Sequence, residues 1–223
     1  MDKPIGKVVA LALRRPLAPL PARVDEAHAV AGLGLRDDIH ADAASPRQVL
    51  LAGAAVYDAL KLAPHALREN LLLDLDTAAL GSGMLLRIGS RATFRLTFQC
   101  EACGRLEAHA PGALRAIGAR RGMLARVVGG GSVREGDTVT LLERRMPALP
   151  EDWRERVALV LAAVPEGMVV GYADLARMAG IQSSYCRTFP RMLARLRADH
   201  AAKAAPARAA TGLPRWDGAG LFE

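Results

Sequence analysis

The alternation of apolar and polar residues divides the chain into two parts of different character. The first part contains five short β-prone runs, bounded by glycine or charged residues: KVVALAL (7–13), MLLRIG (84–89), ATFRLTF (92–98), LARVVGG (124–130) and DTVTLLE (137–143). Three segments have helical spacing instead: 46–62, 64–70 and 111–121. Many short strands with few helices predict a barrel-like β core with peripheral helices, an α+β fold.

The pattern changes after RRMPALPED (144–152), which has two prolines and mixed charges without periodicity. We therefore expect one domain over 1–146, a linker over 147–152 and a second domain over 153–223. The second part predicts an amphipathic helix, a short helix closed by Gly180, a longer helical stretch over 183–205 and a loosely structured tail: DWRERVALVLAAV, ADLARMAG, SSYCRTFPRMLARLRADHAAKAA and AAPARAATGLPRWDGAGLFE. This order is typical of a small helix-turn-helix, winged-helix-like domain.

Charge adds a preference for anionic partners. The 223 residues carry a formal net charge of +7, which favours nucleic acid, anionic cofactors or a membrane surface; the alternative is a soluble protein with many arginines. The charge is concentrated in 181–210, where one acid, Asp199, faces six basic residues: Arg187, Arg191, Arg195, Arg197, Lys203 and Arg208.

The number of cysteines and the lengths of the apolar runs indicate where in the cell the protein is located. Three cysteines without a signal peptide argue against a disulfide framework and for a reducing, cytoplasmic location. Since no apolar run is long enough to span a bilayer, we expect no membrane partner.

Cys100 and Cys103 form a C-x-x-C pair after a β-prone run, and three interpretations compete. A thiolate is a soft ligand for molybdenum, zinc or copper(I), but zinc needs about four ligands and no second cluster is present. A thioredoxin-like redox pair requires a strand followed directly by a long helix. The third interpretation is a pair of inert, half-buried thiols.

Four blocks follow one another in the first 145 residues: GLRDDIHADAASPRQVLL (34–51), LRENLLLD (67–74), CGRLE (103–107) and RGMLARVVGGGSVREGDTV (121–139). In this order they resemble the MOSC domain, named for the C-terminal domain of molybdenum cofactor sulfurases. The resemblance implies a molybdenum–molybdopterin cofactor with Cys103 as the metal ligand. It also implies a set of residues around the pterin and its phosphate: Arg47, Gln48, Glu69, Asn70 and Arg126.

Each of these residues also has a structural interpretation. Arginines bind phosphate through paired hydrogen bonds, but Arg126 on a strand can also be a solvated residue. Glu69 and Asn70 can order a loop around the pterin or simply close a turn. Asp38 and His40 are further catalytic or metal-binding candidates, although a lone loop histidine is more often structural. At Asp37 the family usually has glycine, which permits a positive φ.

The second part resembles another family. RVALVLAAVPEGMVVGYADLARMAG (156–180) is similar to the DNA-binding half of alkylguanine-DNA alkyltransferases and their alkyltransferase-like relatives, with the pattern I-P-x-G-x-V-x-T-Y-G-D-L-A-x-x-A-G. The resemblance implies that Tyr172 rotates a DNA phosphate and that Arg187 fills the space left by a flipped-out nucleotide. Arg191, on the same basic stretch, is a third DNA-binding candidate, and DNA would bind within 153–210.

Two departures from that family bear on function. The alkyl-accepting segment P-C-H-R-V corresponds to LPRWDGAG (213–220), which has neither cysteine nor histidine, so alkyl transfer is excluded. Pro190 replaces a glycine in the recognition helix, where an interior proline costs about 3 kcal/mol or forces a kink.

Three functions follow. In the first, the MOSC part carries out redox or sulfur-transfer chemistry on N-hydroxylated or nucleobase-type substrates; since the chain has no flavin or iron–sulfur motif, a separate reductase would supply electrons. In the second, the chain is a non-enzymatic binder of alkylated or unusual DNA. In the third, the second domain only packs on the first.

Overall fold

The computed structural model covers the whole chain and describes all residues except 19, 102–105, 108–111, 197, 207, 210 and 223, together with the side chain of residue 114. The described chain divides into two compact units. Unit 1 comprises Met1–Ala43 and Arg47–Leu149, and unit 2 comprises Ala44–Pro46 and Pro150–Glu223.

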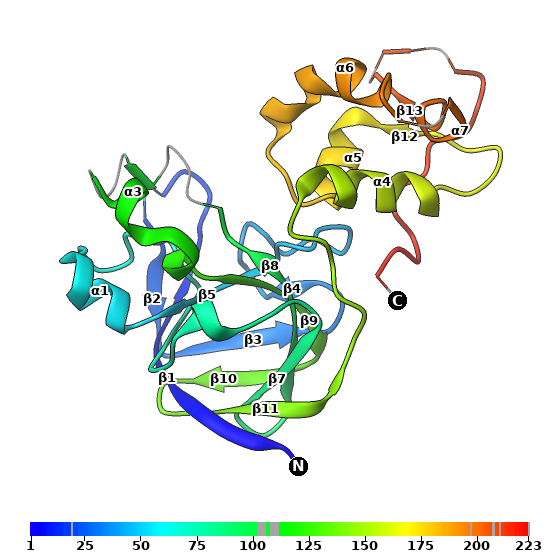
Figure 1. Cartoon of the computed structure of the whole chain (residues 1–223). Helices are drawn as coiled ribbons and strands as arrows, with labels where there is room; N and C mark the ends of the chain where they lie inside the picture. Colours follow the sequence, from blue (N-terminus) through cyan, green and yellow to red (C-terminus); the bar gives the residue numbers. More distant parts are fainter. Residues whose placement is uncertain are drawn as a thin grey trace. The chain divides into compact units, whose positions relative to one another are not determined.

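Unit 1 is built on a closed barrel of seven described strands (Figure 1). In spatial order the strands are β11 (Thr138–Arg145), β7 (Met84–Ile88), β8 (Ala92–Gln99), β9 (Met123–Gly129), β5 (Val49–Gly53), β6 (Leu71–Leu73) and β1 (Lys3–Leu13). The pairing of β1 with β11 closes the barrel, and all neighbours are antiparallel except β5 and β6. The expected α+β fold with a barrel-like β core is confirmed.

Short strands and helices surround the barrel. β2 (Ala22–Val24) extends the sheet beside β1, and β3 (Glu26–Val30), β4 (Gly34–Leu35) and β10 (Gly131–Arg134) form a second small sheet. The helical elements are α1 (Ala55–Leu60), α3 (Ala113–Ile117) and the 3₁₀ helices η1 (Thr77–Ala79) and η2 (Gly118–Arg121).

The barrel core follows from the two-residue period of the strands. Phe94 and Leu96 on β8, and Ala125 and Val127 on β9, alternate into the barrel and are fully buried. All five runs that were predicted as strands lie in barrel strands, because each has this alternation.

The helix predicted over 46–62 is wrong in its first half, where the chain forms β5. All five residues of β5 are buried: Val49 and Leu51 face the barrel core, whereas Ala52 packs in a second apolar cluster with Val56 of α1. A strand that is buried on both faces has no polar face, and its period cannot be told from that of a helix in sequence.

The helix predicted over 64–70 is also wrong, because this segment is a turn. His65 and Arg68 have φ of 59° and 56°, in the left-handed region that a continuous helix excludes. The helix predicted over 111–121 is confirmed in its described part as α3 followed by η2.

Unit 2 begins with the predicted amphipathic helix, α4 (Trp153–Ala163), whose first turn is capped by the Asp152 carboxylate. β12 (Val170–Gly171) and α5 (Tyr172–Met178) follow, and Gly180 ends this helical segment with φ of 66°. The expected short helix and its glycine stop are confirmed.

The prediction of one continuous helix over 183–205 is wrong. The chain forms a 3₁₀ helix η3 (Ser183–Thr188), then α6 (Phe189–Leu193) and α7 (Ala198–Ala201). Pro190 lies in the first turn of α6, where its missing N–H is not needed, so it does not interrupt a helix interior. A helix-turn-helix arrangement of unit 2 stays a prediction.

The tail is more ordered than predicted. β13 (Ala204–Ala205) pairs in parallel with β12, and the backbone of Val169 exchanges hydrogen bonds with Pro214 and Trp216. The Trp216 ring is buried in the core of unit 2, so the tail contributes a large aromatic side chain to the same cluster as Phe189 of α6.

Candidate functional site

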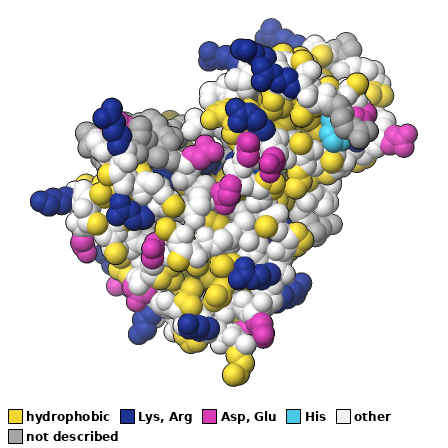
Figure 2. Space-filling view, in the orientation of Figure 1, with side chains coloured by type: hydrophobic (Ala, Val, Ile, Leu, Met, Phe, Trp, Pro, Cys, Tyr) yellow, Lys and Arg dark blue, Asp and Glu magenta, His cyan; other side chains and the backbone are white. Residues whose placement is uncertain are grey.

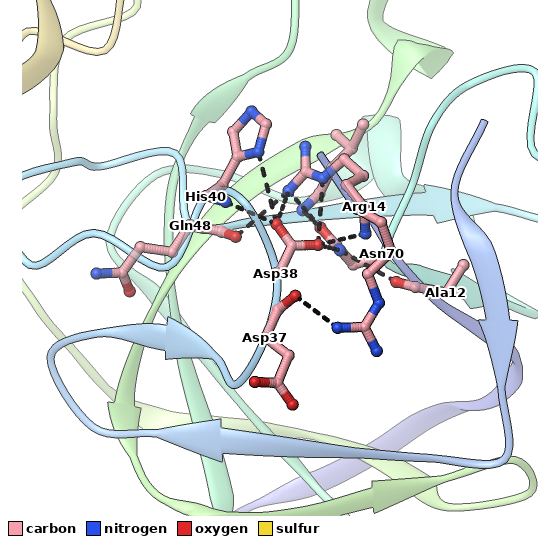
Figure 3. Close-up of polar contacts among 9 residues, drawn as sticks. Ala12, Arg14, Asp37, Asp38, His40, Gln48 and Asn70 are labelled. Carbon is pink, nitrogen blue, oxygen red and sulfur yellow. Dashed lines mark hydrogen bonds and ion pairs between the residues drawn. The ribbon is translucent and has the colours of Figure 1, made fainter. Parts of the chain in front are cut away.

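A buried carboxylate organises one end of the barrel (Figure 3). The Asp38 side chain has no solvent exposure and accepts hydrogen bonds from the backbone N–H of Arg14 (2.8 Å), the backbone N–H of His40 (2.9 Å) and the amide of Asn70 (2.7 Å). The Arg14 guanidinium completes the cluster with an ion pair of 3.4 Å to Oδ1 of Asp38. Every donor therefore converges on one charge that water does not reach.

Asn70 connects this cluster to the barrel wall. Its side-chain oxygen accepts from Arg14 Nη2 (2.7 Å) and from the backbone of Leu50 (3.0 Å), and its amide also donates to the carbonyl of Ala12 (3.1 Å). The predicted sites Asp38 and Asn70 are thus brought together, although 32 residues separate them in sequence.

The cluster perturbs the titration of its members. Burial alone would raise the pKa of Asp38, but His40, the charge of Arg14 and the two backbone donors outweigh it and hold that pKa well below its usual range. Burial lowers the pKa of His40 despite Asp38, whose Oδ1 lies 3.5 Å from Nδ1, so the ring is neutral at pH 7. The site therefore combines a permanent carboxylate with a neutral imidazole.

Gln48 fastens the loop that carries Asp38. Its amide donates to the carbonyls of Gly32 (2.8 Å) and Asp42 (2.9 Å), and its oxygen accepts from the backbone of Val127 on β9 (2.9 Å). These three side-chain bonds of Gln48 all go to backbone groups.

Arg126 lies beside this loop and is also buried. Its guanidinium donates to the carbonyls of Ala43 (3.0 Å) and Gly32 (3.3 Å). Burial and the charge of Arg95, its cross-strand neighbour on β8, lower the pKa of Arg126 to about 10. Arg47 is half-buried, and its charge acts on His40.

Glu69 belongs to a different cluster from its neighbour Asn70. Its carboxylate accepts from the Tyr57 hydroxyl (2.6 Å) and lies 3.1 Å from His65 Nδ1. The hydrogen bond to Glu69 raises the pKa of His65, while burial opposes it. These contacts close the turn after α1, which matches the structural interpretation of Glu69.

Cys103, the predicted metal ligand, lies outside the described residues. Cys100 is buried, and its backbone N–H donates to the carbonyl of Gly122 (2.8 Å). Among the described residues no group of three or more His, Cys, Asp or Glu side chains is placed to hold a metal ion.

Two buried arginines of unit 1 were missed in the sequence. Arg14 directly follows β1 and carries the ion pair with Asp38; the signal was the pair of arginines that ends the apolar run LALRRP. Arg121 ends η2 and is 5% exposed, and its Nε and Nη1 are shielded from solvent without a hydrogen-bond partner. Its signal was the arginine that opens the fourth block.

In unit 2 the three predicted DNA-binding residues differ in exposure. Tyr172 is half-buried and packs edge-to-face on Phe189, with ring centroids 5.4 Å apart. Arg187 and Arg191 are exposed, and Arg195 continues the spacing of four residues. Figure 2 shows Lys and Arg side chains gathered over α6, so unit 2 carries a basic surface there.

The fold and site together define an α+β protein with a closed β-barrel and a buried arginine–carboxylate–amide cluster at one end. Residues 40–140 match the family model of the MOSC domain. The chain therefore contains a MOSC domain, as the four sequence blocks predicted. The match does not extend to unit 2, whose resemblance to alkyltransferases stays a prediction.

Solved structures are similar in fold. The YuaD protein from Bacillus subtilis is 15% identical, with 63% of this chain and 96% of that chain covered at a TM-score of 0.54. A hypothetical protein is 19% identical, with 86% and 92% covered at a TM-score of 0.53. YiiM from Escherichia coli is 19% identical, with 84% and 93% covered at a TM-score of 0.49. No curated protein matches the sequence.

No helix in the described parts of the chain combines the length and the apolar character needed to cross a membrane. The cytoplasmic location stays a prediction.

Proposed function

We propose that unit 1 binds a molybdenum–molybdopterin cofactor and uses it for redox or sulfur-transfer chemistry on N-hydroxylated or nucleobase-type substrates. The observation that supports the proposal is that residues from different MOSC sequence blocks form hydrogen bonds with one another in the structure. Asp38 from the first block meets Asn70 from the second at 2.7 Å, and Gln48 from the first accepts from Val127 of the fourth at 2.9 Å. The third block contains Cys103, the proposed metal ligand.

Arginine side chains of unit 1 fit an anionic cofactor. The charge of Arg68 acts on Arg14, and the buried guanidinium of Arg121 has unpaired donors. Guanidinium groups bind phosphate through paired, charge-assisted hydrogen bonds, so this set can receive a phosphate-bearing ligand.

The predicted cofactor residues then divide into two roles. Asp38, through Arg14 and Asn70, would hold the rim of the site rigid, and Gln48 and Arg126 would fix the loop over 32–43 by their bonds to backbone carbonyls. Arg47 is half-buried and its charge acts on His40, and we propose that these two side chains face the ligand. When bound, the cofactor would supply two-electron chemistry or sulfur transfer at its metal, with electrons from a separate reductase.

The test is the metal and pterin content of the full chain. The protein is purified from a host that makes the molybdenum cofactor, molybdenum is measured by mass spectrometry, and the pterin is measured by fluorescence after oxidation. We expect both to co-purify in equal amounts. A protein that stays free of both, even after incubation with the cofactor, contradicts the proposal.

The basic surface over α6 favours a second candidate, the binding of alkylated or unusual DNA by unit 2. The described residues give Arg187, Arg191 and Arg195 no carboxylate partner, so their charges are available to phosphates. Binding through phosphates weakens with salt, with a slope of about −0.9 per neutralised phosphate.

We therefore expect the triple change of Arg187, Arg191 and Arg195 to alanine to weaken DNA binding and to flatten its salt dependence. Fluorescence anisotropy with a labelled duplex over a salt series measures both. Arg91→Ala, at an exposed arginine of unit 1, is the control and leaves both unchanged. Equal salt slopes for the wild type and the triple variant would exclude this surface.

A further inference from the structure

Arg121 is a buried charge without a counter-charge among the described residues. Its side chain lies at the end of η2, and the three N–H bonds of Nε and Nη1 are shielded from water and unpaired. An arginine stays protonated in a protein, so the chain cannot neutralise this group by losing the proton. Burial of such a charge without partners is strongly unfavourable unless a ligand supplies them.

The carboxylate in this neighbourhood is already engaged. Burial and the adjacent Glu69 raise the pKa of Tyr57 while the charge of Arg121 opposes them, which places Arg121 close to this pair. Both oxygens of Glu69 are taken, one by Tyr57 and one by His65. The described contacts of Glu69 therefore go to Tyr57 and His65, and they include no hydrogen bond to Nε or Nη1 of Arg121.

Arg121 lies just before β9, beside the end of β8. The next residue, Gly122, packs so tightly that an added Cβ would lie 2.4 Å from the carbonyl oxygen of Leu51, and its own carbonyl accepts from the backbone of Cys100. Arg121 thus stands on a rigid backbone beside the strand end that leads to the third sequence block.

We propose that Arg121 is the recognition residue of a phosphate-type oxyanion site at the start of β9. The identity of the oxyanion rests on the proposed function. If unit 1 binds the molybdenum cofactor, the oxyanion is the phosphate group of the pterin. Free inorganic phosphate has the same chemistry and is the other source.

The first test compares thermal unfolding of the full chain in sodium phosphate and in sodium chloride at equal ionic strength. The wild-type Tm rises with phosphate. The Tm of Arg121→Met does not respond to phosphate, and in chloride it lies above that of the wild type, because an unpaired buried charge has been removed. Arg115→Met, at an exposed arginine of α3, keeps the wild-type phosphate response.

Arg121→Lys keeps the charge and loses the planar guanidinium. We expect it to raise the apparent Kd for phosphate at least about tenfold, as measured by calorimetry. Absence of a phosphate-specific response in the wild type, or an unchanged response in Arg121→Met, overturns the inference. A lower Tm of Arg121→Met in chloride also overturns it, since that result assigns Arg121 a purely structural role.

Molybdenum content separates this inference from the proposed function. If the wild type retains molybdenum and Arg121→Met retains less while Arg115→Met is unaffected, the anion is the cofactor phosphate. If the wild type binds phosphate through Arg121 but never retains molybdenum, the oxyanion site stands with free phosphate as its ligand, and the proposed function fails. If Arg121→Met retains molybdenum and phosphate as well as the wild type does, the inference fails and the proposed function stands.

Discussion

Asp38 shows how a single residue links sequence, stability and site geometry. Its carboxylate lies in the protein interior, where a charge is tolerated only with close donors, and Arg14, Asn70 and His40 supply them. Because its pKa is lowered on folding, Asp38 stabilises the folded state above the ordinary aspartate pKa of about 3.9, and the contribution is lost as pH falls toward the folded-state pKa.

We expect Asp38→Asn to lower the free energy of unfolding by about 3–5 kcal/mol at pH 7, because Arg14 then keeps a buried charge without its partner. The difference from the wild type shrinks as pH falls below about 4. Urea unfolding over a pH series measures this. Asp37→Asn, at the exposed neighbour, is the matched control and keeps the wild-type acid dependence; the same dependence in Asp38→Asn would contradict the assigned role.

Asp37 departs from the family pattern, which has glycine there, and aspartate tolerates a positive φ less well than glycine. The structure nevertheless has Asp37 at φ of 64°, with its carbonyl accepting from Arg15. The burial of Arg14 was not predictable, since an apolar run followed by two arginines does not indicate which of the two side chains points into the protein.

The β-prone runs and α4 were predictable from local patterns, and β5 was not. The five runs form barrel strands, although β8 and β9 are buried on both faces over much of their length, and α4 forms where the apolar spacing predicted it. The sequence predicts a helix where β5 forms, because β5 lies between the barrel core and the α1 cluster and has no polar face.

Helix α4 also contains a tertiary contact that its amphipathic pattern conceals. Arg156 is buried; its Nε donates to the carbonyl of Ala179 at the end of α5, and its Nη1 donates to the carbonyls of Pro150 and Glu151. The side chain therefore joins the start of unit 2 to the segment that precedes η3.

Arg156→Met should destabilise unit 2 by about 2–4 kcal/mol, because it leaves buried carbonyls without donors. Thermal unfolding followed by tryptophan fluorescence reports on unit 2, where both tryptophans lie. Arg154→Met, at an exposed arginine of the same helix, costs less than about 1 kcal/mol. Equal effects of the two changes would refute a special role for Arg156.

For the whole molecule, the sequence allowed the MOSC domain and the barrel to be predicted, because the four blocks and the strand alternation are local patterns. The ordered tail was not predictable, since the hydrogen bonds of Val169 with Pro214 and Trp216 join segments more than 40 residues apart. The chemistry of the barrel end is likewise a long-range property, because Arg14, Asp38 and Asn70 meet only in the closed barrel.

The most direct test of the central claim is the molybdenum content of the full chain with single cysteine replacements. Wild type and Cys186→Ser, whose sulfur lies in unit 2, should retain molybdenum equally, and Cys103→Ser should lose it at least about tenfold, since a hydroxyl is a poor replacement for a soft thiolate ligand. If Cys103→Ser carried as much molybdenum as the wild type, or none of the three proteins carried any, the account of the barrel as a molybdenum cofactor site would be wrong.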